Sequence, residues 1–144
     1  MNYEFERFDS VGGSYEPKVS IRGNGAIGFS QGALRRFELL EGDWFICLFY
    51  DRKNGVIGIQ PVKEETSGCL RLIKRVIKGK DGRDSVNAFV SAKSFLDYFG
   101  IDYSQTKSYR AELDEGTRKI VFNIGQPDHL RKPSAGEEGG SQSQ

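Results

Sequence analysis

The sequence has few of the residues from which metal centres and nucleophilic active sites are built. Its 144 residues include one histidine and two cysteines. His129 lies in a polar segment near the end of the chain, and Cys47 and Cys69 have no CxxC spacing. A zinc site, a Cys–His dyad and a Ser–His–Asp triad therefore lack their parts. We expect a protein that is not an enzyme, with no metal, no cofactor and no small-molecule substrate.

Long apolar runs are also missing. No apolar stretch approaches the roughly 18 residues that a membrane-spanning helix needs. The first ten residues, MNYEFERFDS, have no basic region followed by an apolar one, as a secretory signal would. These absences predict no membrane association and a cytoplasmic location. Because both cysteines lie in or beside apolar stretches, we expect them to be buried free thiols.

Neither sign of charge dominates the whole chain, but the charges are unevenly distributed. The formal net charge is +1, from 21 basic and 20 acidic residues. Residues 1–16 carry four acidic side chains and one arginine, whereas residues 69–83 carry six basic side chains and one aspartate. Such a basic stripe can be an electrostatic footprint for phosphate groups. The alternative is a solvated sheet face, or a sheet edge that lysines protect from association.

The first half of the chain reads as hairpin, helix, hairpin. Residues 18–22 alternate apolar and polar side chains, and the GNG that follows predicts a tight turn into a second strand. Ser30 is expected to cap a short helix over 31–39. The run WFICLFY, 44–50, suits a strand buried on both faces, and Asn54-Gly55 predicts the turn into VIGIQPV.

The second half repeats this order at an offset of 61 or 62 positions. Residues 69–91 predict a hairpin that turns near 80–83, because β-branched residues and flanking glycines favour strand over helix. A helix over 92–99 follows, capped by Ser91 and closed by Gly100, and then a hairpin over 107–124. One such unit would leave an apolar face bare, and the second copy can cover it.

These patterns predict a mainly β chain with two short helices and a simple domain organisation. The predicted parts are an N-terminal extension (1–16), a first unit (17–65), a second unit (66–125) and a disordered polar tail (126–144).

The first unit resembles a known family. The stretch VSIRGNGAIGFSQGALRRFELLEGDWFICLFYDRKNGVIGIQPV is similar to the AbrB/SpoVT-type domain, also called the swapped-hairpin barrel. GAIGFS stands where that family has the strand before its helix, ALRRFEL resembles the helix, and LEGD resembles the turn after it. The second unit shows the same order more faintly, and two units in one chain resemble the arrangement of the MraZ regulators. The resemblance implies two β-hairpin–helix–β-hairpin units that form a pseudo-symmetric swapped-hairpin barrel.

The resemblance also implies binding of double-stranded DNA by a transcription regulator or an antitoxin, with a homodimer or higher oligomer possible. On matching positions it points to Arg22 in the first hairpin and to Arg35 and Arg36 on the helix. Because Leu34 lies on the buried side of this helix, the two arginines are expected to face outward. Ala26 departs from the family, which commonly has arginine there, and the second helix carries only Lys93. Together with the basic stripe, the predicted DNA-contacting residues are Lys18, Arg22, Arg35, Arg36, Arg71, Lys74, Arg75, Lys78, Lys80 and Arg83.

Two alternatives stay open at this point. The helix arginines can form ordinary surface ion pairs with Glu38, Glu41 or Asp43, each worth about 0–1 kcal/mol. The protein can also be an interaction or assembly module that has the barrel fold without binding DNA, which the near-zero net charge and the missing arginine at Ala26 favour.

Overall fold

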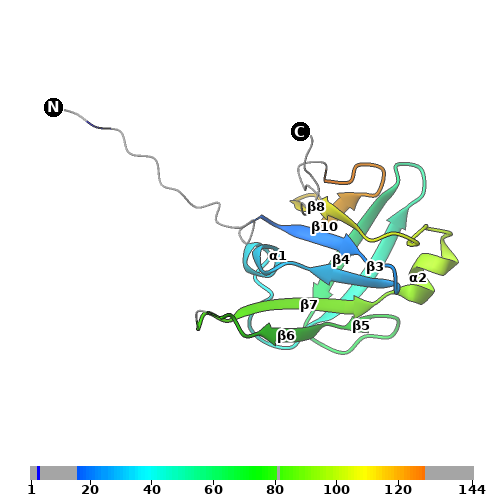
Figure 1. The fold of residues 1–144 in the computed structure, drawn as a ribbon. Helices are drawn as coiled ribbons and strands as arrows, with labels where there is room; N and C mark the ends of the chain where they lie inside the picture. The colour runs from blue at the N-terminus through cyan, green and yellow to red at the C-terminus, as the bar shows by residue number, and fades with distance from the viewer. Residues whose placement is uncertain (1–2, 4–15, 81, 129–144) are drawn as a thin grey trace, which may run out of the picture.

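The computed structural model describes residues 3, 16–80 and 82–128. They form two five-stranded antiparallel sheets and two short helices, which confirms the predicted mainly β class (Figure 1). Sheet A has the order β6 (Ile73–Ile77), β7 (Ser85–Ser91), β2 (Ala26–Phe29), β1 (Lys18–Ile21), β8 (Lys107–Arg110). Sheet B has the order β5 (Leu70–Arg71), β3 (Phe45–Asp51), β4 (Val56–Val62), β10 (Lys119–Asn123), β9 (Glu112–Asp114).

The first helix begins where the sequence predicts but ends at Arg36, with Phe37 as its C-cap, rather than at residue 39. Helix α1 (Gln31–Arg36) follows β2, and the Ser30 hydroxyl accepts a hydrogen bond from the Ala33 N–H at 3.0 Å. This satisfies one of the N–H groups that a helix start leaves unpaired. Ala33 and Leu34 are fully buried and attach the helix to the core.

The second helix, α2 (Lys93–Tyr98), has the same place in the second copy but a weaker start. Its N-cap is Ala92, which makes no side-chain hydrogen bond. The predicted Ser91 cap is therefore wrong, because Ser91 is the last residue of β7. The helix ends alike in both copies: Leu39 donates to the Leu34 carbonyl, and Ile101 donates to the Leu96 carbonyl. Figure 1 shows the two helices at opposite ends of sheet A.

Strands of the two copies pair with each other. At the centre of sheet A, β2 pairs with β7 so that Ala26 lies opposite Ser91 and Phe29 opposite Ala88. Residues 88 and 91 are the equivalents of 26 and 29 at an offset of 62, so this pairing is symmetric between the copies. In addition, β1 pairs with β8, and β5 pairs with β3. The pairings among the described residues do not close a barrel, so the swapped-hairpin barrel stays a prediction.

The inward faces of both sheets meet in one apolar core. Both copies supply it, as the repeat predicts, and no described polar or charged residue is buried in it. The largest fully buried side chains are Phe29, Ile21, Ile27, Leu34, Leu39, Ile46, Ile57, Ile59, Leu96, Ile120, Val19 and Val90.

Two expectations for the strand at 44–50 are wrong. It is not buried on both faces, because alternate residues of β3 point away from the core and Phe49 is 43% exposed.

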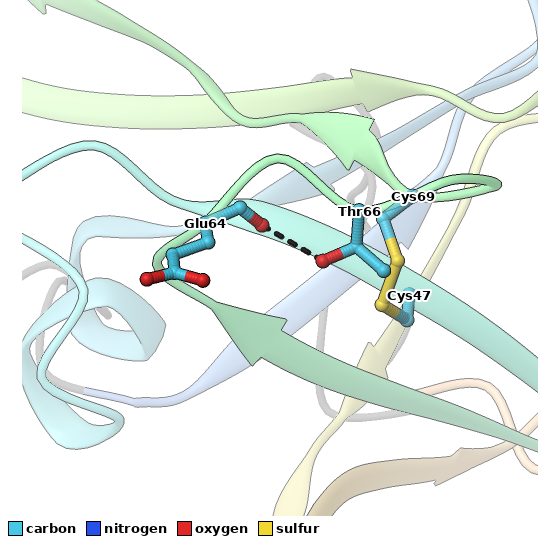
Figure 2. Close-up of a disulfide and its surroundings, with 4 residues drawn as sticks. All are labelled: Cys47, Glu64, Thr66 and Cys69. Carbon is cyan, nitrogen blue, oxygen red and sulfur yellow. Dashed lines mark hydrogen bonds between the residues drawn. A yellow bond between two sulfur atoms is a disulfide. The ribbon is translucent and has the colours of Figure 1, made fainter.

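Cys47 is not a free thiol but forms a disulfide with Cys69, which precedes β5 (Figure 2). The pairing of β3 with β5 brings the two Cα atoms to 4.4 Å, within disulfide range. Figure 2 also shows the loop before Cys69, where the Thr66 hydroxyl donates to the Glu64 carbonyl at 2.9 Å.

The first three residues of the predicted disordered tail are packed against the fold. Residues 126–128 pack on sheet A, where the Asp128 N–H donates to the Ser108 carbonyl at 2.8 Å. The remainder of the predicted tail, with His129, and nearly all of the predicted N-terminal extension lie outside the described residues. In the described part of the chain, no helix has the length and apolar character needed to cross a membrane.

Candidate nucleic-acid interface

One face of sheet A points away from the core and is positively charged. Residues paired across the strands lie on the same face, so Ser20, Gly28, Phe89 and Ile73 form one outward row. None of the described strand residues on this face is acidic. We call this surface the sheet A outer face; it consists of Lys18, Ser20, Arg22, Ala26, Gly28, Ile73, Arg75, Ile77, Ser85, Asn87, Phe89, Ser91, Ser108 and Arg110.

Two arginines of this face lie against one aromatic ring. The guanidinium carbon of Arg22 is 5.9 Å from the centroid of the Phe89 ring, and that of Arg75 is 5.1 Å from it. A cation over a ring face is attracted by the ring quadrupole. A guanidinium near a ring still has N–H groups with which it can donate to oxygen acceptors such as phosphate.

Gly28 makes room for this arrangement. It pairs with Phe89, and a Cβ at this position would collide with the Arg22 guanidinium. Arg22 therefore lies flat across Gly28 beside the ring. In the described part of the chain, no ion pair joins a carboxylate to Arg22 or Arg75.

Lys18 lies on the same face but is already occupied by carboxylates. Its Nζ is 2.7 Å from Asp128 Oδ2 and 3.4 Å from Glu16 Oε1. The Asp128 side chain is only 3% exposed, so this pair is partly shielded from water. Lys18 is thus the least available cation of the sheet A outer face.

The arginines of α1 point outward, as predicted, but they line hollows rather than the Phe89 cluster. Arg36 faces a hollow of about 730 Å³ between the end of β8 and β10, together with Arg110 and Glu112. Arg35 lines a different hollow, which also contains Glu41. The structure therefore brings Arg22 and Arg75 together and places the helix pair elsewhere.

The basic stripe of 69–83 does not lie on one surface, because successive strand residues point to opposite sides. Arg75 joins the Phe89 cluster, whereas Arg71 lies 5.1 Å from the ring of Phe45 at sheet B. Lys74 donates to the carbonyls of Leu40 and Gly42 at 2.7 and 2.6 Å and holds that loop.

The remaining stripe residues belong to the end of β6 and its turn. Lys78 is paired with Asp84 at 3.3 Å, and both side chains are well exposed. Lys80 and Arg83 are exposed in the turn between β6 and β7.

The basic residue of α2 is held in a hydrogen-bonded group. Lys93 Nζ donates to Tyr103 Oη at 3.0 Å and to Asp97 Oδ2 at 3.1 Å, and the Tyr103 hydroxyl donates to Asp97 Oδ1 at 2.7 Å. The hydrogen bond to Tyr103, followed by the one to Asp97, raises the pKa of Lys93. The hydrogen bond from Tyr103, followed by that from Lys93, lowers the pKa of Asp97. Lys93 is thus engaged within its own copy.

Sequence reasoning did not single out Phe89, Gly28 or Arg110. Phe89 stands in the apolar run AFV, which hides the alternation that places Ala88 and Val90 inside and Phe89 outside. The signal that could have found the cluster is the symmetric pairing of β2 with β7, which sets Gly28 opposite Phe89.

Comparison with family models, with curated proteins and with solved structures gives no match for this chain. Among the described residues, no group of three or more His, Cys, Asp or Glu side chains is placed to hold a metal ion.

Proposed function

We propose that this protein binds double-stranded DNA through the sheet A outer face and acts as a transcription regulator or an antitoxin-like protein. The observation that carries the proposal is the placement of Arg22 and Arg75 against Phe89, on a face whose described strand residues include no acid. DNA affinity arises mainly from cations that replace counterions along the phosphate backbone. Guanidinium groups suit this task, because their fork of N–H donors matches phosphate oxygens.

The first unit's resemblance to the AbrB/SpoVT-type domain supports the same assignment, because it points to Arg22 in the first hairpin. The pairing of β1 with β8 and of β5 with β3 is consistent with two interleaved copies, and the swapped-hairpin barrel belongs to this proposal. Within it, Arg35 and Arg36 extend the contact beyond the sheet A outer face.

The experiment is a fluorescence-anisotropy titration of a labelled random-sequence duplex over a series of salt concentrations. We expect affinity to fall steeply with salt. The double variant Arg22→Ala, Arg75→Ala should bind about a hundredfold more weakly, since a hydrogen bond to a charged group contributes about 1.5–3 kcal/mol. The slope of the logarithm of its affinity against the logarithm of the salt concentration should also be smaller by about two, because about two phosphate contacts are lost.

The matched control is Lys119→Ala, which removes a cation from sheet B that also lies over a ring. We expect this variant to bind like the wild type. The double variant Arg35→Ala, Arg36→Ala should bind more weakly than wild type but more tightly than the Arg22 and Arg75 double variant. Binding that ignores both salt and the Arg22 and Arg75 substitutions would overturn the proposal.

A cytoplasmic location also belongs to this proposal, and one observation bears against it. Cytosolic thiols are kept reduced in most organisms, whereas Cys47 and Cys69 form a disulfide. Alkylation of free thiols at the moment of cell lysis, followed by mass spectrometry, distinguishes a cytoplasmic location from an oxidising compartment. Alkylated Cys47 and Cys69 would support the cytoplasm, and an intact disulfide would point to an oxidising compartment.

A second candidate function is protein interaction. It is favoured by strand β6, where Ile73, Val76 and Ile77 are 42%, 60% and 48% exposed. Sedimentation of the protein alone, combined with the duplex titration, separates the two functions: a stable oligomer that is indifferent to DNA would favour assembly.

A further inference from the structure

The edge of sheet A at β6 has backbone groups that no described strand pairs. Strand β6 has β7 on one side only, as Figure 1 also shows. The Val86 N–H donates to Gln31 Oε1, on the side of β7 away from β6. Val86 and Val76 are therefore a non-hydrogen-bonded pair, in which the backbone groups of each residue point away from the partner. The N–H and C=O of Val76 consequently face the open edge.

The backbone N–H and C=O groups of Leu72 and Lys74 point to the same side of β6 as those of Val76. The Leu72 N–H donates to the Trp44 carbonyl at 2.9 Å, so this edge is covered at Leu72 and opens after it. Because backbone direction alternates along a strand, Lys74 also presents its N–H and C=O to the open side. The free edge thus runs from Lys74 to the end of β6.

Side chains along this edge are apolar and basic. Ile73, Val76 and Ile77 are all at least 42% exposed, which is unusual for β-branched residues on a strand. Arg75 and Lys78 are also exposed, while Lys74 is used by the Leu40 and Gly42 carbonyls.

A second copy of the chain fits this edge poorly in the two registers that centre on Arg75 and Val76. Two β6 strands related by a two-fold axis must place like faces together. An axis at Arg75 would put Arg75 opposite Arg75 of the second copy, and an axis at Val76 would put Lys74 opposite Lys78. Like charges directly opposite each other destabilise a strand pair.

We propose that β6 binds an extended acidic segment of a partner protein, which adds a strand to sheet A. The partner would exchange backbone hydrogen bonds with Lys74 and Val76, place an apolar side chain opposite Val76 on one face of the sheet, and place a carboxylate opposite Arg75 on the other face. This is strand addition to an exposed sheet edge, in which main-chain bonds give affinity and side chains give specificity. The inference does not depend on DNA binding, because the open backbone groups of β6 define the edge; Arg75 belongs to both surfaces.

The test uses the full chain and a labelled heptapeptide, Glu-Val-Glu-Val-Glu-Val-Glu, in an anisotropy titration. We expect saturable binding that weakens about tenfold when alternate peptide amides are N-methylated, because they can no longer donate to the edge. A Lys-Val peptide of the same length should bind at least tenfold more weakly. Equal binding of the methylated and unmethylated acidic peptides would overturn strand addition.

Substitutions in the protein locate the site. Val76→Pro removes only an N–H that faces the open edge, so the sheet should tolerate it and peptide binding should fall about tenfold. The matched control is Ser108→Pro on β8, the opposite edge strand of sheet A, which should leave peptide binding unchanged. If Val76→Pro does not fold, the N-methylated peptide on the wild type decides alone.

The same protein variants and peptides also test two other arrangements: a second copy of the chain at the β6 edge, and the acidic segment bound on the sheet A outer face. A wild-type dimer in sedimentation that Val76→Pro dissociates would mean that a second copy covers the edge, and would overturn the proposal. The variant Arg22→Ala should keep peptide binding within about twofold. Loss of peptide binding in that variant would place the acidic segment on the sheet A outer face instead of the edge.

Discussion

The outer faces of the two sheets share a packing arrangement but differ in charge. On sheet A, Arg22 lies across Gly28 beside Phe89. On sheet B, Phe49 pairs with Gly58, and Lys119 lies 4.6 Å from the Phe49 ring. In both cases a glycine leaves space for a cationic side chain to lie over the ring on a neighbouring strand.

The two faces differ in the charges that surround the cation, which is Arg22 on sheet A and Lys119 on sheet B. The outer face of sheet B carries three carboxylates, on Asp51, Glu112 and Asp114. Asp114 pairs directly with Lys119 across the strands. The described strands of sheet A place no carboxylate on their outer face. A cation over a ring is therefore not by itself a phosphate site, because the neighbouring charges decide whether a polyanion can approach.

The first prediction concerns the disulfide, which lies on the sheet B side. Replacing Cys47 and Cys69 by serine should lower the free energy of unfolding by about 3 kcal/mol, because the cross-link closes a 22-residue loop in the unfolded chain. Urea denaturation measures this, and reducing the wild type should give the same shift. DNA affinity should change less than twofold at 25 °C. A large loss of affinity in a folded serine variant would mean that the sheet A outer face does not act alone.

The second prediction compares the two glycines. Gly28→Ala should displace the Arg22 guanidinium and weaken DNA binding about fivefold, because the flat position beside Phe89 is lost. Gly58→Ala is the matched control: its Cβ would lie 3.2 Å from the Lys119 side chain, and DNA binding should be unaffected. Duplex titration measures both, with thermal unfolding as the folding control. Equal effects of the two variants would remove the distinction between the faces.

The third prediction concerns the two helix starts at opposite ends of sheet A. Ser30→Ala should cost about 1 kcal/mol, because Ser30 caps α1 and also accepts the Lys18 N–H. Ala92→Ser should give no stabilisation, because Ala92 is buried in the core and its backbone, with ψ 15°, does not have the extended conformation of the Ser30 cap. Urea denaturation of both variants checks the symmetry of the copies. A clearly stabilising Ala92→Ser would contradict this and would show that α2 can form the same cap as α1.

The smallest expected effect depends on pH and concerns α2. Because hydrogen bonds from Tyr103 and Lys93 lower the pKa of Asp97 in the folded protein, they contribute stability above the unfolded pKa of about 4. That contribution is lost as the pH falls through the folded pKa. Tyr103→Phe should therefore lower the melting temperature slightly at pH 7, and the difference should shrink below pH 4. A difference that persists in acid would indicate lost packing instead.

The sequence predicted the local elements well because local signals specify them. The GNG and Asn54-Gly55 turns and the Ser30 cap lie in short segments whose backbone requirements can be read directly. The repeat also identified the mutual covering of apolar faces. The disulfide and the Phe89 cluster could not be read in this way, because both depend on which strands become neighbours. Cys47 meets Cys69 only through the pairing of β3 with β5, and Arg22 meets Arg75 only across β2 and β7.

The most direct test of the central claim is an NMR titration of the isotope-labelled protein with a short random-sequence duplex, following backbone amides and arginine Nε–H groups. We expect the largest chemical-shift changes at Ser20, Arg22, Arg75 and Phe89, and no changes at Phe49 and Lys119. Changes confined to the outer face of sheet B, or no changes at duplex concentrations that saturate a basic DNA-binding protein, would contradict it.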